Sequence, residues 1–150
     1  MTRKTTADDV TAIILEVFQL NGRLIESGNA LVKDLDLTSA RWQVLGALAL
    51  ADTPMTIPDI ARAMGLTRQS VQRLANEMAE TGIVRFEDNM RHKRSRYVVL
   101  TAKGKALHAA TEKRQVPWAA QLGAGISRSD IQTALDVLRQ IRSRLEENRR

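Results

Sequence analysis

Apolar residues recur at intervals of three and four along most of the chain, the spacing of one face of an α-helix. The first such stretch, residues 8–33, places on that face Val10, Ile13, Ile14, Val17, Leu20, Leu24 and Ile25. Gly22 and Gly28 lie inside it, and because glycine disfavours the interior of a helix, we expect a bend or a break there. The pattern therefore predicts a long first helix that is either bent or broken.

Three shorter helices are predicted next, each from a start or stop signal. Thr38 can cap a helix over 39–51. Thr56 opens the following helix, where Asp59 completes a capping box. Gly65 ends that helix by supplying a left-handed backbone. Thr67 then caps a fourth helix over 68–81, whose apolar side carries Val71, Leu74, Ala75 and Met78.

The period of the pattern changes from 3.6 to 2 residues after the fourth helix, which is typical of half-buried β-strands. Residues 83–87 and 96–100 are rich in β-branched and aromatic side chains and are joined by a polar loop, so we expect a hairpin. Helices over 102–123 and 128–147 follow. The last one has a narrow apolar seam, typical of a coiled coil, at Ile131, Leu135, Leu138, Ile141 and Leu145.

The two short helices that meet at Gly65 have the spacing of a helix-turn-helix. Ala61 is small where the helices would cross, and Val71 is apolar where the second would pack on the first. The polar side of the second helix carries Thr67, Arg68, Gln69, Ser70, Gln72 and Arg73. Arginine, glutamine and hydroxyl side chains can read the edges of base pairs. A helical hairpin with a solvated polar face would show the same local pattern.

The loop of the predicted hairpin favours the DNA-binding interpretation. Residues 89–96 contain no acidic side chain, and their basic and histidine residues are Arg91, His92, Lys93, Arg94 and Arg96. A basic loop directly after a helix-turn-helix is typical of a wing, which reaches phosphates and inserts an arginine into the minor groove. We therefore predict a mainly α-helical winged helix-turn-helix in which these loop residues also contact DNA.

The distribution of charge agrees with this picture. The chain of 150 residues has a net charge of +6, but residues 62–114 hold 12 basic and 5 acidic residues. Residues 1–61 hold 5 basic and 8 acidic residues, and residues 115–150 hold 6 basic and 4 acidic residues. A confined basic block indicates a binding face for a polyanion. Five aromatic residues are too few for the stacking surfaces that bind RNA or single strands.

Other classes of function find little support in the composition. Without cysteine, and with His92 and His108 as its two histidines, the chain offers no disulfide, thiolate nucleophile or typical zinc site. The adjacent carboxylates form no plausible acid/base pair. The longest apolar run, Trp42 to Ala51, is far too short to span a membrane. We expect a cytoplasmic protein that is no enzyme and uses no metal or cofactor.

Four stretches carry a family resemblance: LTSARWQVLGAL (37–48), TIPDIARAMGLTRQSVQRLANEMAETGIVRF (56–86), RHKRSRYVVLTAKG (91–104) and LGAGISRSDIQTALDVLRQIRSRL (122–145). In their order and spacing the chain resembles the MarR family of winged-helix transcription regulators. The resemblance implies a DNA-binding lobe over 37–101 and a helical dimerisation region formed by 1–36 and 102–150. It also implies homodimers whose terminal helices intertwine, with DNA contacts from 67–73 and Arg94.

Some positions differ from the family's usual pattern. The family often has an aspartate where His92 stands, a proline where Met90 stands and a glutamine where Arg41 stands. Many members bind a small anionic or phenolic compound between the dimer helices and the lobe. The resemblance thus implies a small aromatic or anionic effector. The residues that could line its site are Phe18, Arg41 and Trp42, and core packing is the alternative for Trp42.

Together these features predict a sequence-specific regulator that binds double-stranded DNA and acts as a repressor. As a homodimer it would bind a palindromic operator with half-sites about one helical turn apart. The alternative is a winged-helix adaptor that binds protein and not DNA. The polar face at 67–73 discriminates between the two and favours DNA binding, because it is basic and rich in glutamine, whereas an adaptor surface would be apolar or acidic.

Overall fold

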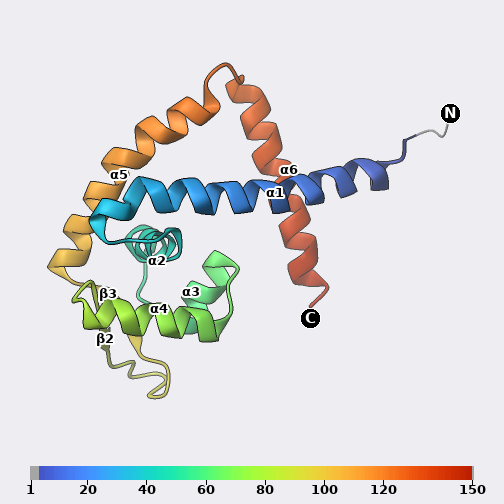
Figure 1. Cartoon of the computed structure of the whole chain (residues 1–150). Helices are drawn as coiled ribbons and strands as arrows, with labels where there is room; N and C mark the ends of the chain where they lie inside the picture. The colour runs from blue at the N-terminus through green and yellow to red at the C-terminus, as the bar shows by residue number, and fades with distance from the viewer. Residues whose placement is uncertain (1–3, 150) are drawn as a thin grey trace. The chain divides into compact units, whose positions relative to one another are not determined.

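The computed structural model describes residues 4–149, which form helices and one small sheet (Figure 1). In chain order the elements are α1 (Thr6–Val32), a 3-10 turn (Lys33–Leu35), α2 (Ser39–Leu50), β1 (Met55–Thr56), α3 (Ile57–Met64), α4 (Arg68–Glu80), β2 (Val84–Glu87), β3 (Tyr97–Leu100), α5 (Ala102–Gly123) and α6 (Arg128–Glu147). The chain divides into two compact units after Arg114, within α5. The predicted mainly α-helical fold with a small hairpin is confirmed.

The predicted helix starts are confirmed in atomic detail. The hydroxyl oxygens of Thr38, Thr56 and Thr67 each accept a hydrogen bond from the backbone N–H three residues further on. The carboxylate of Asp59 in turn accepts from the backbone N–H of Thr56 at 2.9 Å, completing the capping box. Gly65 has a φ of 66°, the left-handed conformation expected at the end of α3. Local side-chain chemistry thus sets these boundaries.

The predicted break in the first helix is wrong, because α1 runs without interruption from Thr6 to Val32. Gly28 is tolerated there because it lets α2 approach. A Cβ atom at Gly28 would lie 2.5 Å from Oγ of Ser39, and that hydroxyl donates a hydrogen bond to the carbonyl of Ile25 at 2.7 Å. The glycine therefore serves tertiary packing instead of ending the helix.

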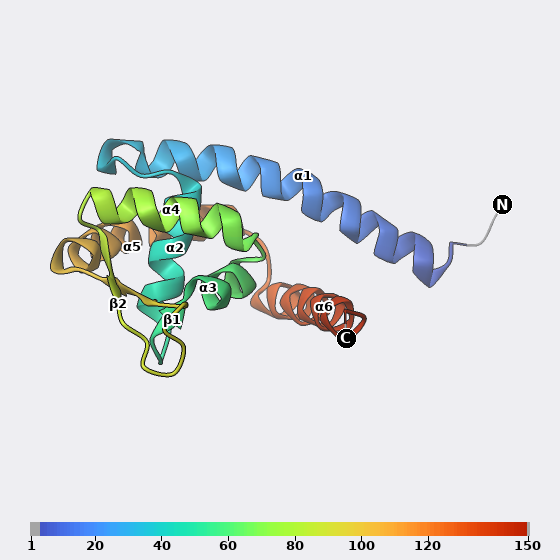
Figure 2. The same cartoon turned by 90° about the horizontal axis from the view of Figure 1, so that it is seen from below.

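The core of the first unit lies between α2, α3, α4 and the sheet (Figure 2). Helix α2 contributes Val44 and Leu45, and α4 contributes four residues of its apolar side. The buried apolar residues are Val32, Leu37, Val44, Leu45, Ile57, Ile60, Ala61, Val71, Leu74, Ala75, Met78, Ile83, Val84, Val98 and Leu100. Because α4 buries its apolar side against this core, its polar side faces outward.

The sheet contains three antiparallel strands in the order β1-β3-β2. Strands β2 and β3 form the predicted hairpin, with Phe86 opposite Val98. Strand β1 was not predicted from the sequence. It has two residues, too few to show a period, and its partner β3 lies about 40 residues further along the chain, with Met55 opposite Val98.

The hairpin continues directly into α5. Oγ1 of Thr101 accepts a hydrogen bond from the backbone N–H of Gly104 and donates to the carbonyl of Gly82 at 2.5 Å, while the backbone N–H of Thr101 donates to the carbonyl of Ile83 at 3.1 Å. Gly104 itself packs against that carbonyl so closely that a Cβ atom would lie 2.2 Å from its oxygen. The start of α5 is therefore fixed to the base of β2.

An ion pair joins α5 to the turn after α1. The guanidinium of Arg114 donates to the carbonyl of Leu31 at 3.0 Å and to both carboxylate oxygens of Asp34. These hydrogen bonds lower the pKa of Asp34 and raise that of Arg114. The bidentate geometry fixes the relative orientation of the two side chains, so the pair links the first part of α5 to the turn after α1.

Helices α1 and α6 leave much of their apolar surface uncovered. Helix α1 buries Gly28 and Val32, and the described part of α6 buries no residue. The exposed large apolar residues of the two helices are Ile14, Leu15, Val17, Phe18, Leu20, Leu24 and Ile25 on α1, and Ile131, Leu138 and Leu145 on α6. Three of the five residues of the predicted α6 seam are thus exposed, while Leu135 and Ile141 are half-buried.

Candidate nucleic-acid interface

The exposed side of α4 presents a continuous polar surface. Arg68, Gln69, Gln72 and Arg73 are exposed, while Ser70 is half-buried. The hydroxyl of Thr67 is engaged in capping, since it accepts from the backbone N–H of Ser70 at 3.1 Å and donates to its Oγ at 2.8 Å. The long arginine and glutamine side chains can therefore reach a ligand, whereas the hydroxyls of Thr67 and Ser70 cap the N-terminus of α4.

The loop between β2 and β3 is ordered by a buried amide, that of Asn89, which is 4% exposed. Its Nδ2 donates to the carbonyl of Ser95 at 3.0 Å, and its Oδ1 accepts from the backbone N–H of Arg91 at 3.1 Å. Backbone hydrogen bonds from His92 to Asn89 and from Ser95 to His92 close two turns. The loop is therefore preorganised, and the side chains of Arg91, His92, Lys93 and Arg94 are exposed.

The last arginine of the loop is held by an aromatic ring. The guanidinium carbon of Arg96 lies 4.6 Å from the centre of the Phe86 ring, a cation–π distance. Phe86 is half-buried in β2 and packs against the core. The contact leaves the guanidinium exposed but restricts its position, so less conformational entropy is lost when it binds an anion.

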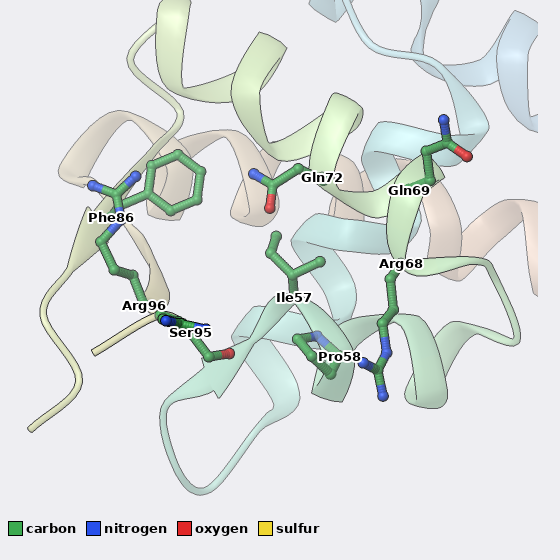
Figure 3. A pocket seen from close by; sticks show the side chains of 9 residues that line it. Ile57, Pro58, Arg68, Gln69, Gln72, Phe86, Ser95 and Arg96 are labelled. Atoms are coloured by element: carbon green, nitrogen blue, oxygen red, sulfur yellow. The ribbon is translucent and has the colours of Figure 1, made fainter. Parts of the chain in front are cut away.

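A groove of about 520 Å³ lies between α4 and the loop. Figure 3 shows Phe86 and Arg96 on one side, Arg68 and Gln69 on the other, and Gln72, Ile57 and Pro58 between them. Five of the predicted DNA contacts line this groove, namely Arg68, Gln69, Gln72, Arg94 and Arg96. The groove thus combines three arginines with two amides, a donor-rich lining suited to phosphate and base edges.

The other predicted DNA contacts lie outside the lining of this groove. Thr67 and Ser70 form the cap of α4, and Arg91, His92 and Lys93 stand on the exposed tip of the loop. Arg73 lines a second, smaller pocket together with Ile25, Asn29, Thr38, Ala40, Arg41, Leu74 and Glu77. The structure therefore separates Arg73 from Arg68 and Gln72, although all three lie on α4.

The three candidate effector residues are not brought together. Of them, Arg41 lines the second pocket, where its Nη2 lies 3.0 Å from Oε2 of Glu77. Phe18 is 69% exposed on α1 and does not line this pocket. Trp42 is half-buried, packs against the core and approaches Gly28. The core packing considered as the alternative for Trp42 is thus present, and its role in effector binding stays a prediction.

The roles of three residues of the site were not predicted from the sequence, namely those of Asn89, Phe86 and Glu77. Asparagine is common in turns because its side chain bonds nearby backbone, so Asn89 at the first position of the loop carried a usable signal. The role of Phe86 depends on Arg96 across the hairpin, and that of Glu77 on Arg41, 36 residues away. No local pattern indicates such partners.

Residues 4–149 show no cluster of three or more histidine, aspartate or glutamate side chains that could hold a metal ion. Within the same range, none of the helices combines the length and apolar character needed to cross a membrane.

Comparison with known proteins gives a match to one family model and a relative that is similar over most of its length. The family model described as MarR family matches residues 35–95. The uncharacterized protein Rv2011c of Mycobacterium tuberculosis is 32% identical over 135 residues, which cover 90% of this chain and 93% of that protein.

Two solved structures share the fold. BldR, a transcriptional regulator from Sulfolobus solfataricus, matches with a TM-score of 0.84 at 16% identity, covering 94% of this chain and 99% of that one. CouR from Rhodococcus jostii RHA1, solved with p-coumaroyl-CoA bound, matches with a TM-score of 0.74 at 19% identity, covering 93% and 95%. At these identities the likeness concerns the fold alone.

Proposed function

Because the chain belongs to the MarR family of transcription regulators, we propose that it is a homodimeric repressor that binds a specific double-stranded DNA sequence. The observation that carries this proposal is the groove shared by α4 and the loop, which is lined by Arg68, Gln69 and Gln72 of α4 and by Arg94 and Arg96 of the loop. We call the loop, residues 89–96, the wing from here on.

The two sides of the groove suit different parts of a duplex. Helix α4 has the exposed arginine and glutamines that form bidentate bonds with guanine and adenine in the major groove. The wing carries four lysine and arginine residues, suited to phosphates and to the narrow minor groove. We propose that α4 reads the sequence and that Arg94 enters the adjacent minor groove.

Dimerisation is proposed from the uncovered apolar surfaces. Helix α1 exposes seven large apolar residues and α6 exposes three at seven-residue spacing, Ile131, Leu138 and Leu145. Exposed apolar surface of this extent marks an interface. We propose that residues 1–36 and 102–150 pair with those of a second copy and that residues 37–101 form the DNA-binding lobe. A two-fold dimer then binds a palindrome with half-sites about one helical turn apart.

Titration with inverted-repeat duplexes from the region upstream of the gene tests the proposal. With about 6–10 phosphate contacts per dimer, the affinity should fall by about 10³- to 10⁵-fold between 50 and 200 mM salt. Arg94→Ala should weaken binding to most sequences and flatten the salt dependence. Arg85→Ala is a matched control, because that guanidinium is already paired with Glu87 at the base of the hairpin.

Salt-insensitive or absent binding to every duplex would contradict the proposal and favour a protein-binding adaptor. The direction of control is tested separately, with a reporter gene placed behind the bound sequence. We expect transcription to rise when the protein is deleted, because a dimer seated on a promoter excludes the polymerase. A fall in transcription would identify an activator.

We further propose that a small aromatic anion binds in the second pocket and thereby causes the protein to release its DNA. This pocket, about 340 Å³ in volume, is lined by the guanidinium of Arg73, by the ion pair of Arg41 with Glu77, and by the apolar side chains of Ile25 and Leu74. CouR, which shares the fold, is a protein whose structure holds p-coumaroyl-CoA.

Benzoate and p-coumarate, added to the preformed complex with DNA, test this effector proposal. Release that requires Arg41 supports it. Release that is unchanged in Arg41→Ala would place the effector elsewhere, for example beside Phe18 or Trp42.

A further inference from the structure

We infer that Arg41 is a positioning residue for DNA binding: it holds the carboxylate of Glu77 and thereby leaves the guanidinium of Arg73 free for a phosphate. The inference rests on the proposed function, because it concerns one of the DNA contacts of α4. It assigns a role to two residues, Arg41 and Glu77, that do not face the groove between α4 and the wing.

The ion pair between Arg41 and Glu77 connects two helices. Nη2 of Arg41, in the first turn of α2, lies 3.0 Å from Oε2 of Glu77 in α4. The two side chains are 24% and 40% exposed, so the pair is partly shielded from water. Partial burial strengthens an ion pair relative to one in open solvent. Glu77 therefore has a defined partner outside its own helix.

The stability of α2 does not explain an arginine at this position. The first turn of a helix is the positive end of its dipole, where acidic side chains are favoured and basic ones are not. Thr38 already caps the backbone N–H of Arg41. A basic side chain here raises the free energy of α2 unless an anion lies close by, and Glu77 supplies that anion.

Glu77 has a second possible partner on its own helix. Arg73 precedes Glu77 by four residues, one turn, and side chains at that spacing are neighbours on a helix surface. Arg73 and Glu77 also line the same pocket as Arg41. Yet within residues 4–149 Arg73 forms no ion pair, and its side chain is exposed. Arg41 and Arg73 are therefore alternative partners for one carboxylate.

The choice of partner has a consequence for DNA binding. An arginine that is already neutralised by a carboxylate gains little from a phosphate, and it contributes less to counterion release. As long as Arg41 holds Glu77, the positive charge of Arg73 remains available. When Arg41 is removed, Glu77 can pair with Arg73 and withdraw that charge from the DNA.

A purely structural role for the pair makes a different prediction. If Arg41 and Glu77 only tied α2 to α4, removing either residue would break the tie, and removing both would restore nothing. If Arg41 shields Arg73 from Glu77, neutralising Glu77 in the Arg41 variant should restore DNA binding. The double variant therefore separates the two explanations.

The test measures the affinity of the full-length protein for its operator duplex over a range of salt concentrations. Arg41→Ala should weaken binding by about tenfold, and the slope of log K against log salt should decrease by about 0.9 for each phosphate that the protein no longer neutralises. Arg41→Ala/Glu77→Gln should recover the affinity and slope of the wild type. Arg41→Ala/Glu80→Gln is the matched control, since it has the same net charge but neutralises a carboxylate that does not line the pocket.

Two further measurements make the outcome decisive. In an Arg73→Ala background, Arg41→Ala should have no additional effect on affinity. In a crystal structure of Arg41→Ala without DNA, the carboxylate of Glu77 should lie within about 4 Å of the guanidinium of Arg73, the usual limit for an ion pair.

Failure to rescue by Glu77→Gln, or equal rescue by Glu80→Gln, would overturn the inference while leaving the DNA-binding function intact. A wild-type protein that binds no duplex would instead overturn the proposed function, and the crystal structure would still decide whether Glu77 changes partner.

Discussion

Helix α4, in the proposed DNA-binding lobe (residues 37–101), buries its apolar side, whereas the terminal helices α1 and α6 leave much of theirs exposed. Helix α4 buries Val71, Leu74, Ala75 and Met78. The seam of α6 leaves Ile131, Leu138 and Leu145 exposed by 42%, 41% and 63%. The period of the sequence is helical in both cases.

The difference teaches that a hydrophobic period locates a face but does not identify what covers it. In the lobe, the sheet and two other helices lie near enough in the chain to cover α4, so its polar side is left for a ligand. For α1 and α6 the burial that stabilises an amphipathic helix has to come from elsewhere, and we propose a second copy of the chain. The predictions below test this division.

The largest effect is expected from truncating a covered side chain. Met78 is fully buried, and Met78→Ala should lower the free energy of unfolding by about 2–5 kcal/mol, through reduced burial and a residual cavity. Leu50→Ala is the matched control, because Leu50 is 78% exposed at the end of α2, and it should change stability by less than about 0.5 kcal/mol. Urea unfolding measures both. Similar losses at the two sites would show that the lobe does not bury α4 as described.

A substitution in the exposed seam of α6 should change self-association, which depends on protein concentration, and not the stability of the lobe. Leu138→Asp places a charge in the proposed interface, and we expect it to weaken self-association by about a hundredfold, or about 2.7 kcal/mol. Gln140→Asp adds the same charge to the exposed polar side of α6 and should leave association unchanged. Sedimentation equilibrium measures the effect. A wild-type protein that stays monomeric at high micromolar concentration would contradict the dimer.

The parts of the fold that could be predicted from sequence are those that local chemistry decides. A hydroxyl caps its own helix, so Thr38, Thr56 and Thr67 mark their helix starts correctly. Gly65 ends α3 through its own backbone conformation. In the candidate site, the polar side of α4 follows from the same helical period, and the basic wing follows from its composition.

The parts that could not be predicted depend on contacts between distant residues. Gly28 looks like a helix breaker until Ser39 packs against it. Strand β1 has two residues and exists because β3 pairs with it. The partner of Arg41 is 36 residues away, so no local pattern indicates its ion pair with Glu77.

The start of α5, which packs against the lobe, and the exposed part of α1 should give opposite results for one substitution, glycine to alanine inside a helix. At Gly104 the new Cβ would lie 2.2 Å from the carbonyl oxygen of Ile83, and backbone cannot move aside cheaply. We expect a loss of about 1–3 kcal/mol, typical of overpacking. At Gly22 in α1 no atom lies within 4 Å of the new Cβ, and helix propensity should stabilise the protein by about 0.5–1 kcal/mol. Thermal unfolding of both variants is the measurement, and a stabilised Gly104→Ala would refute the close docking of α5.

The smallest effect compares two capping boxes of the same design. At the start of α3, the backbone N–H of Thr56 donates to Asp59 and is the main cause of the lowered pKa of that carboxyl, against a smaller opposing effect of burial. At the start of α1, the backbone N–H of Thr5 lowers the pKa of Asp8 in the same way. Because α3 belongs to the core of the lobe and the start of α1 is exposed, only the first box should affect global unfolding.

Asp59→Ala should therefore lower the free energy of unfolding by about 0.3–1.5 kcal/mol at neutral pH, while Asp8→Ala should leave it unchanged and increase hydrogen exchange in the first turn of α1. The folded pKa of Asp59 lies below its unfolded value, so the carboxylate stabilises the fold fully above about pH 5 and loses this contribution as the pH falls through the folded pKa. The difference between wild type and Asp59→Ala should accordingly shrink in acid. Equal losses for Asp8→Ala and Asp59→Ala at neutral pH would mean that the exposed end of α1 unfolds together with the lobe, and the contrast between the two regions would then lie in their surfaces and not in their stability.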